Sequence, residues 1–384
     1  MKAVIISGNK YPLEDAGALR QHSIAKLFQM LKYDALVLGY GKPTYGKIKV
    51  FDGIEYVSFR PSCNNVFIRA FYRYIFIDRV VRFLKKNIRN VDVILVVDVL
   101  PKDFKKIEKL AVYYNAELIH DSVEWYSPEE FPEGERNRSY RNKEYTNNVA
   151  ISSSWRVIAI SKYLENHFLN KCSVVTRIPV IIDVLSIKPV LSCLNNKVVF
   201  VYAGGPGKKD YLKTILDGFL KLDAAEKELV EFHIIGVNKD QLISLCSVDS
   251  CVIDSLNSLL TIHGRLSHAE AVSFVKNASY TILIRDETLR YSKAGFPTKV
   301  VESLAYGTPV LCNLTSDLND YLVDSENSII AGGHQPDDVA RAIRTAIKID
   351  NDSYFEMRKN ARKTAETYFD YRKYVDSLLN LLTL

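Results

Sequence analysis

The stretch AGFPTKVVESLAYGTPV at residues 294–310 has the residue types and spacing to bind a phosphorylated ligand. Pro297 suits the first position of a helix, where its missing N–H costs nothing. The free amides of Thr298, Lys299 and Val300 then point out of the helix N-terminus, and with the helix dipole they favour an anion. The pattern therefore predicts a phosphate cradle at the start of this helix.

Glu302 lies four residues after Thr298, one turn deeper on the same helix face. A carboxylate at that position accepts two hydroxyl hydrogen bonds, such as those of a ribose diol. Gly295 lets the backbone approach a ligand closely, Gly307 ends the helix, and Pro309 blocks its continuation. A phosphate cradle beside a diol clamp suits a nucleoside diphosphate.

Short apolar runs alternate with helical patterns along the chain, which predicts βαβ units and mostly parallel sheets covered by helices. We therefore expect an α/β protein of two Rossmann-like, doubly wound domains that face each other across a cleft. Ligands of such sheets bind outside the carboxyl ends of the strands, so the loops there are expected to carry the site.

The alternation lapses near 184–196, which is the expected seam between the domains. The predicted domains span 1–185 and 186–367. The last helix, about 368–384, carries an apolar stripe and is expected to pack back on the first domain.

The composition is that of an ordinary folded protein, with 47% hydrophobic and 25% charged residues among 384. This excludes a disordered or collagen-like chain. No apolar run is long enough to span a bilayer or to form a signal-peptide core, so a cytoplasmic location is expected. The net charge of +6 permits an anionic ligand or membrane surface without demanding nucleic acid. The cysteines show no CxxC pair or zinc spacing and are expected to be free thiols: Cys63, Cys172, Cys193, Cys246, Cys251 and Cys312.

These motifs resemble those of the GT-B glycosyltransferases, specifically the large retaining group often called family 4. Its members end the donor site with E-x-F-G-x-x-x-x-E, a helix and G-x-P-V; residues 294–310 stand in that place, and Glu302 matches the second glutamate. The segment VYAGGPGKKD at 201–210 is similar to the family's strand followed by G-R-x-x-x-x-K, whose basic residues neutralise the leaving diphosphate. Further segments that resemble the family lie at 157–164, 177–183, 232–236 and 262–270.

Two positions depart from the family pattern. The first family glutamate, which contacts the donor sugar, is replaced by Ala294, and the arginine after the strand glycine is replaced by Gly205. Recognition of the donor sugar is therefore expected to differ from that of the family. The candidates to supply it are Arg285, Lys293 or Lys299. Positive charge for the diphosphate is expected from Lys208 or Lys209, with Arg265 as a second candidate.

In the first domain, Gly17 matches the family's glycine-rich first loop, which approaches the diphosphate; the alternative is a plain turn or helix-start glycine. Arg20 follows one turn later and is a candidate to face the cleft. His120 and Asp121 follow a short apolar run, where the family often places a histidine that contacts the donor sugar. A lone histidine at a strand end is more often structural, so both interpretations stay open.

The acceptor side is also expected in the first domain. Glu124 and Trp125 follow the same apolar run and are predicted to contact the acceptor. The segment 66–88 mixes aromatic, aliphatic and basic residues, among them Arg69 and Arg73. It fits either a core-packing helix with a solvated face or an interfacial helix attracted to anionic lipid heads, and the lipid-linked acceptors of many relatives favour the second.

The resemblance implies a hexosyltransferase-like enzyme that moves a sugar, with retention, from a nucleotide-diphosphate sugar to a glycan or lipid-linked glycan, with a UDP-sugar favoured. It implies surface polysaccharide synthesis at the inner face of the plasma membrane, without a metal, because protein charges and helix dipoles replace it. Two alternatives stay open: a non-catalytic homologue that partners another transferase, and a nucleotide-sugar 2-epimerase. The predicted catalytic residues are His120, Asp121, Lys209 and Glu302. The predicted donor-binding residues are Gly17, Gly204, Gly205, Lys208, Lys209, Arg265, Arg285, Gly295, Phe296, Pro297, Thr298, Lys299 and Glu302.

Overall fold

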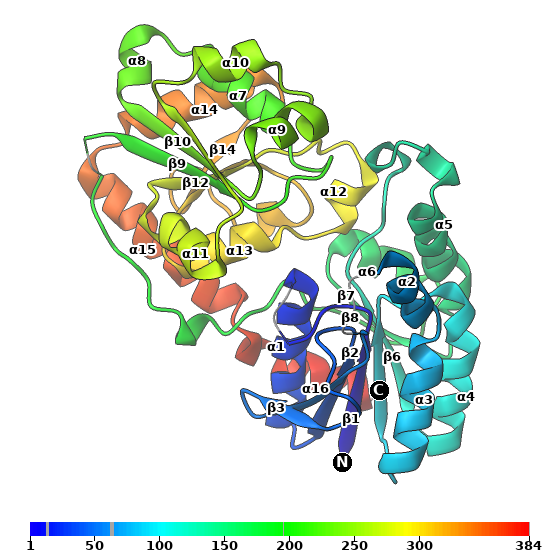
Figure 1. Cartoon of the computed structure of the whole chain (residues 1–384). Helices are drawn as coiled ribbons and strands as arrows, with labels where there is room; N and C mark the ends of the chain where they lie inside the picture. Colours follow the sequence, from blue (N-terminus) through cyan, green and yellow to red (C-terminus); the bar gives the residue numbers. More distant parts are fainter. Residues whose placement is uncertain (13–14, 62–64, 195, 384) are drawn as a thin grey trace. The chain divides into compact units, whose positions relative to one another are not determined.

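The computed structural model describes residues 1–12, 15–61, 65–194 and 196–383, which form two compact units (Figure 1). The first unit comprises Met1–Trp125, Glu135–Asp183 and Tyr371–Leu384, and the second comprises Tyr126–Gly134 and Val184–Asp370. Cys63 lies outside the described residues, and the other five cysteines are free thiols. Each unit is built on its own parallel sheet, which confirms the predicted α/β class with two parallel-sheet domains.

The first unit has an eight-stranded sheet in the order β3-β4-β2-β1-β5-β6-β7-β8. All neighbouring strands are parallel except β3 and β4, which form a hairpin. The strands β2, β1 and β5 in the middle of the sheet are mostly apolar and buried, because helices cover both faces of a parallel sheet. The strands are β1 (Lys2–Ser7), β2 (Asp34–Gly39), β3 (Lys49–Phe51), β4 (Ile54–Ser58), β5 (Val93–Val97), β6 (Glu117–Ser122), β7 (Arg156–Ala159) and β8 (Val175–Arg177).

The helices of the first unit are α1 (Ala16–Met30), α2 (Val66–Tyr74), α3 (Phe76–Asn87), α4 (Phe104–Tyr114), α5 (Arg138–Tyr145), α6 (Lys162–Leu169) and α16 (Val375–Thr383). The last helix, α16, packs against α1 and β8, so the C-terminal segment completes the core of this unit. Leu378 and Leu381 are fully buried there beside Phe28 of α1.

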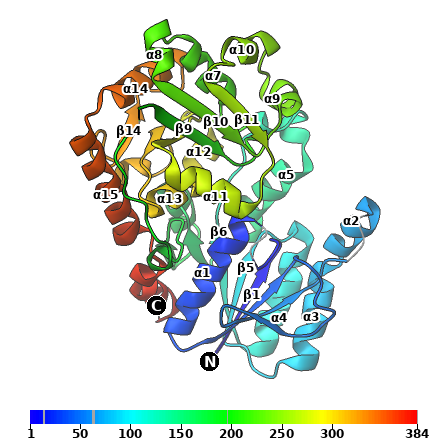
Figure 2. The ribbon, with the colours of Figure 1, turned by 60° about the vertical axis from the view of Figure 1, so that its left-hand side comes forward.

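The second unit has a six-stranded, fully parallel sheet in the order β11-β10-β9-β12-β13-β14 (Figure 2). Its strands are β9 (Val198–Ala203), β10 (Val230–Ile235), β11 (Leu260–Gly264), β12 (Tyr280–Leu283), β13 (Val310–Asn313) and β14 (Ser328–Ala331). The chain winds outward from β9 in one direction and from β12 in the other. The carboxyl ends of β9 and β12 therefore form a topological switch point, where open α/β sheets bind ligands.

The helices of the second unit are α7 (Leu212–Leu220), α8 (Ala224–Glu228), α9 (Lys239–Cys246), α10 (Ser250–Ser255), α11 (His268–Asn277), α12 (Arg290–Ala294), α13 (Thr298–Ala305), α14 (Pro336–Lys348) and α15 (Asn351–Tyr368). α13 packs against β12, β13 and α15, and α14 packs against α7 and β14. The start of α13 thus lies beside the switch point.

The nine residues Tyr126–Gly134 belong to the second unit although they lie in sequence between β6 and α5 of the first. The Ser127 hydroxyl accepts a hydrogen bond from the Tyr291 amide at 3.0 Å, and Arg290 Nε donates to the Tyr126 carbonyl at 3.0 Å. We call this segment the strap. The sequence did not predict it, because its apolar and polar residues follow no helix or strand period.

None of the described helices is long and apolar enough to cross a membrane. The segment 66–88, predicted as one helix, is two helices that meet at Ile75, whose backbone leaves the helical range at φ −95° and ψ 10°.

Candidate functional site

Four side chains form a hydrogen-bonded network at the carboxyl ends of β9 and β12. The carboxylate of Asp210 is 5% exposed and accepts from Arg285 Nε at 2.7 Å and from the Tyr202 hydroxyl at 2.7 Å. Lys299 Nζ donates to Oδ2 of this carboxylate, the oxygen that also accepts from Tyr202, and it donates to the Tyr202 hydroxyl at 2.7 Å. The network joins the strand end, the following loop and the first turn of α13.

Burial alone would raise the pKa of Asp210, but Arg285 and Lys299 outweigh it and hold that pKa at about 2. Burial lowers the pKa of Lys299, and Asp210 opposes the shift. Asp210 is therefore ionised, and it neutralises one of the two cations, Arg285 and Lys299, that were predicted to recognise the donor sugar. Sequence reasoning missed Asp210, although an acidic residue directly after two lysines was a visible signal.

Glu302 lies one turn further along α13 and is half-buried; its partial removal from water raises its pKa to about 7, with a smaller opposing effect of Lys299. It lines a cavity of about 40 Å³ that is otherwise apolar except for Lys299 and Thr281. No described residue forms a hydrogen bond or ion pair with the Glu302 carboxylate. Since buried polar groups are nearly always hydrogen-bonded, this group is suited to accept hydrogen bonds from a ligand.

The N-terminus of α13 differs in two details from the prediction. Pro297 is the N-cap, with φ −76° and ψ 103°, and the helix begins at Thr298. The Val300 amide donates to the Pro297 carbonyl at 3.1 Å, so it is not available to an anion. The amides of Thr298 and Lys299 precede the first helical hydrogen bond and remain at the helix end, where the dipole favours an anion.

Phe296 and Gly307 have structural roles here. Phe296 is 6% exposed and packs edge-on against Tyr321 and Phe369, so the predicted donor contact is an anchor of the loop before α13. Gly307 has φ +73° and follows the last turn of the helix, as predicted. Gly295 ends α12 with φ −86°, a conformation open to any residue.

Gly204 is the glycine that the site requires. Its φ is +134°, and a Cβ atom at this position would lie 2.5 Å from Cε of Lys299. A side chain here would displace Lys299 from Asp210. Gly205, in contrast, is exposed and has open space around it.

Of the other predicted cations, Lys209 is held by the strap. Its Nζ lies 3.0 Å from Glu130 Oε2, whose side chain is 4% exposed, and 5.0 Å from the centre of the Tyr126 ring. Lys208 and Arg265 are exposed, and no described residue pairs with either. These two remain available to a diphosphate.

The structure contradicts the placement expected for His120 and Asp121. His120 is 2% exposed and lies in the core between the rings of Phe104 and Phe168, and this burial lowers its pKa to about 3. Asp121 is 1% exposed, and Arg20 donates to both of its carboxylate oxygens at 2.8–3.2 Å. Both side chains are buried because β6 extends through both residues to Ser122, between β5 and β7.

Arg20, the partner of Asp121, is also buried in the first unit. It is 4% exposed and also donates to the carbonyls of Ile178 and Pro179, so it cross-links α1, β6 and the segment after β8. Gly17 lies in the first turn of α1, where a Cβ would come within 2.4 Å of the Asn9 amide group. Its role in the structure is close packing against the loop after β1.

The residues predicted to contact the acceptor have different surroundings in the structure. Trp125 is 6% exposed, donates to Glu144 Oε1 at 2.7 Å and packs 4.5 Å from the His167 ring, so it is a packing residue. Glu124 is half-buried beside it. Arg73 is tied to the carbonyl of Gly8 at 2.6 Å and to Asp98 at 2.9 Å, which fastens α2 to the ends of β1 and β5.

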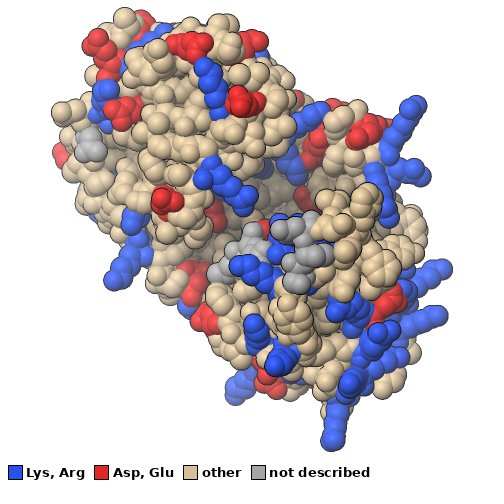
Figure 3. All heavy atoms as spheres, viewed as in Figure 1, with Lys and Arg blue, Asp and Glu red and all other residues tan. Residues whose placement is uncertain are grey.

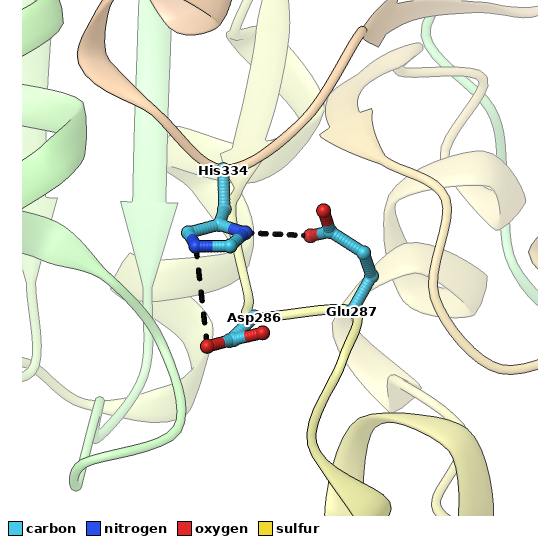
Figure 4. Close-up of side chains that lie close together, drawn as sticks. All are labelled: Asp286, Glu287 and His334. Atoms are coloured by element: carbon cyan, nitrogen blue, oxygen red, sulfur yellow. Dashed lines mark hydrogen bonds and ion pairs between the residues drawn. The ribbon is translucent and has the colours of Figure 1, made fainter.

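A further cluster of titratable groups lies at the ends of β12 and β14 (Figure 4). His334 Nδ1 lies 2.8 Å from Glu287 Oε2, and its Nε2 lies 3.9 Å from Asp286 Oδ2. Among the described residues, this is the group whose His and carboxylate atoms could hold a metal ion. Each member already has a partner, since Asp286 accepts from Thr288 and Glu287 accepts from Asn313. Metal-independence stays a prediction.

The second unit is similar to known proteins in sequence. Residues 186–365 match the family model described as Glycosyl transferases group 1. An uncharacterised glycosyltransferase of Methanocaldococcus jannaschii is 22% identical over 239 residues. That match covers 58% of this chain and 59% of the relative, which is less than two thirds of its length.

Several solved structures share the fold over the whole chain. HepE from Anabaena, in complex with UDP and glucose, is 14% identical with a TM-score of 0.68, covering 100% of this chain and 99% of its own. Sucrose-phosphate synthase from Thermosynechococcus elongatus is 13% identical with a TM-score of 0.71, covering 99% and 98%. WaaG, a glycosyltransferase involved in lipopolysaccharide biosynthesis, is 11% identical with a TM-score of 0.68, covering 99% of each chain. The chain therefore has the GT-B fold of these proteins, and the comparisons support the predicted glycosyltransferase class.

Proposed function

We propose that the protein transfers a sugar, with retention, from a nucleotide-diphosphate sugar to a glycan or lipid-linked glycan, as the match of residues 186–365 to the glycosyl transferases group 1 model supports. The observation that carries this proposal is the half-buried Glu302 carboxylate, which has no hydrogen-bond partner among the described residues and lies one turn beyond the start of α13. A ribose diol supplies the two donors that this carboxylate lacks.

The diphosphate is placed at the start of α13. The amides of Thr298 and Lys299 supply donors there, and Lys299 with Arg285 and Asp210 leaves one net positive charge. Lys208 and Arg265, both exposed, add positive charge from neighbouring loops. A UDP-sugar is the favoured donor, in keeping with the UDP complex of the Anabaena structure.

The proposed chemistry needs no enzymic nucleophile. The bond between the anomeric carbon and the leaving phosphate oxygen breaks, and the acceptor oxygen bonds to that carbon on the same face. The acceptor proton passes to the leaving phosphate oxygen. His120 and Asp121 take no part, because both are buried in the core of the first unit.

The acceptor is proposed to bind the first unit, at a membrane surface. α2 exposes an apolar stripe in which Phe67 is 86%, Phe71 58% and Tyr74 53% exposed. Figure 3 shows Lys and Arg side chains gathered over the part of this unit that carries α3 and α4. Apolar and basic surfaces side by side suit an anionic bilayer, so we place the protein at the cytoplasmic face of a membrane in surface polysaccharide synthesis.

Calorimetric titration with UDP, GDP, ADP and CDP sugars tests the donor site. We expect one class to bind and Glu302→Gln to weaken it roughly ten- to hundredfold, the loss typical of hydrogen bonds to a charged group. The matched control is Glu356→Gln, whose carboxylate is 60% exposed and pairs with Lys359 on α15. Absence of any nucleotide binding would instead support a non-catalytic partner of another transferase.

The anomeric configuration of the product, read by proton NMR, tests retention. The product linkage is expected to keep the configuration of the donor, and an inverted linkage would contradict the proposed mechanism. Consumption of the donor sugar without any acceptor would favour the 2-epimerase alternative.

A further inference from the structure

A cavity of about 250 Å³ lies in the first unit, near the carboxyl ends of β2 and β4. Its walls combine three aromatic rings, of Tyr45, Phe59 and Tyr72, with two guanidinium groups, of Arg60 and Arg79. None of the described residues that line it is acidic. Its size is near the lower end of the range for small-molecule sites, roughly 300–1,000 Å³, and suits a single sugar ring.

Arg79 is held between two of the rings. Its guanidinium lies 4.7 Å from the centre of the Tyr72 ring and 5.6 Å from that of Phe59, and its Nη1 donates to the Phe59 carbonyl at 2.9 Å. Described residues therefore use one of its five N–H donors. A guanidinium fixed in this way offers the rest of its fork to a carboxylate or phosphate, with little entropy lost on binding.

Tyr45 lines the cavity and has an unfavourable backbone conformation. Its ring is 78% exposed and its φ is +54°, a region that costs a non-glycine residue roughly 1–2 kcal/mol. The turn is closed by a hydrogen bond from the Lys47 amide to the Thr44 carbonyl at 3.0 Å. Two hydrogen bonds join Thr44 to Ser58 at the end of β4. The Thr44 amide donates to the Ser58 carbonyl at 3.2 Å, and the Thr44 hydroxyl accepts from the Ser58 amide at 3.3 Å. The fold thus keeps an aromatic ring exposed beside the cavity at some cost to stability, which points to a ligand.

We propose that this cavity binds a sugar ring that carries an anionic group, as part of the acceptor. The inference rests on the proposed function, because it assigns the acceptor to the first unit. The flat ring of Tyr45 matches the C–H face of a pyranose, and Arg79 and Arg60 pair with the anionic group. That group is either the carboxylate of a uronic acid or a phosphate on the sugar, since both satisfy the same guanidinium fork.

Saturation-transfer NMR with glucuronate, glucose 6-phosphate and glucose, each without donor, tests the inference. We expect at least one anionic sugar to bind at least tenfold more tightly than glucose. Binding of glucuronate alone identifies the carboxylate, and binding of glucose 6-phosphate alone identifies the phosphate. Glucose bound as tightly as the anionic sugars, or no sugar bound at all, would overturn the proposal.

Two variants locate the binding. Arg79→Gln is expected to lower the affinity at least tenfold, whereas Arg82→Gln, an exposed arginine one turn along α3, leaves it unchanged. Tyr45→Gly removes the ring and relieves the positive φ, so it lowers affinity without lowering the melting temperature. Unchanged affinity in both Arg79→Gln and Tyr45→Gly would overturn the assignment. UDP titration of the same samples separates this outcome from failure of the donor site, because the two ligands bind different units.

Discussion

Arg285 Nε lies 2.7 Å from a carboxylate oxygen of Asp210, and Lys299 holds the other oxygen of the same group. Two cations that would otherwise repel each other at the end of the sheet are thereby fixed around one buried anion. The arrangement keeps a single net positive charge at the start of α13 and positions Lys299 without a phosphate bound. Asp210 is thus a positioning residue for the proposed donor site.

Asp210→Asn is expected to destabilise the protein by about 3–5 kcal/mol, because it leaves two partly buried cations without their counter-ion. Urea unfolding followed by circular dichroism measures the change. The matched control is Asp217→Asn, which removes the partner of Lys213 in a partly exposed pair at 3.1 Å and should cost less than about 1 kcal/mol. Equal stability of the two variants would show that the network contributes nothing.

Glu302 is expected to make stability and nucleotide affinity depend on pH in opposite directions. Its pKa rises on folding from the ordinary 4.5 to about 7, so between pH 4.5 and 7 the folded state binds more protons than the unfolded state. The free energy of unfolding therefore falls as the pH rises from 4.5 to 7. Nucleotide affinity rises over the upper part of this window, because the ionised carboxylate is the better acceptor. Glu302→Gln should lose both dependences.

Thermal unfolding and calorimetry at pH 5.5, 6.5 and 7.5 measure these effects. Glu270 has a fully exposed carboxylate in a helix cap of the same unit, and Glu270→Gln serves as the control. If Glu302→Gln keeps the pH profile of nucleotide binding, the carboxylate does not contact the nucleoside.

His120→Phe is expected to retain activity and to make the protein more resistant to acid. Burial lowers the pKa of His120 from 6.5 to about 3, so the unfolded state binds the extra proton and stability falls as pH drops from 6.5 toward 3. Phenylalanine between Phe104 and Phe168 removes this loss. His268→Phe, at an exposed position, should leave the acid sensitivity as it is. Loss of turnover in folded His120→Phe would restore the catalytic interpretation.

Replacing Phe67 and Phe71 of α2 together with serine is expected to lower binding to anionic vesicles more than tenfold, because burying each ring contributes about 1.5–3 kcal/mol. Vesicle flotation measures the bound fraction. The control is serine at Val112 and Tyr113, which are 83% and 60% exposed on α4. Equal loss in both double variants would assign the effect to general surface hydrophobicity rather than to α2.

The alternation of apolar runs was enough to predict two parallel-sheet domains, because buried strands and amphipathic helices have different periods. The helix at 298–305 was likewise visible, since Pro297 and Gly307 mark its two ends by their backbone chemistry. The hairpin of β3 and β4 was missed although Asp52-Gly53, between Phe51 and Ile54, is a typical hairpin turn. The break at Ile75 was missed because it lies within an apolar run.

Site residues were less predictable, because which way a strand end points is a tertiary property. His120 and Asp121 stand after an apolar run, but β6 extends through them, and pairing with β5 and β7 keeps them in the core. Likewise, the sequence indicates no partner for Lys209, whereas in the structure Glu130 of the strap forms an ion pair with it. A one-dimensional pattern cannot show that a segment between two elements of one unit packs on the other.

The most direct test is a crystal structure of the protein with a UDP-sugar. We expect the diphosphate at the amides of Thr298 and Lys299, and the ribose hydroxyls within hydrogen-bonding distance of Glu302. A nucleotide bound elsewhere, with the Glu302 carboxylate still unpartnered, would contradict it.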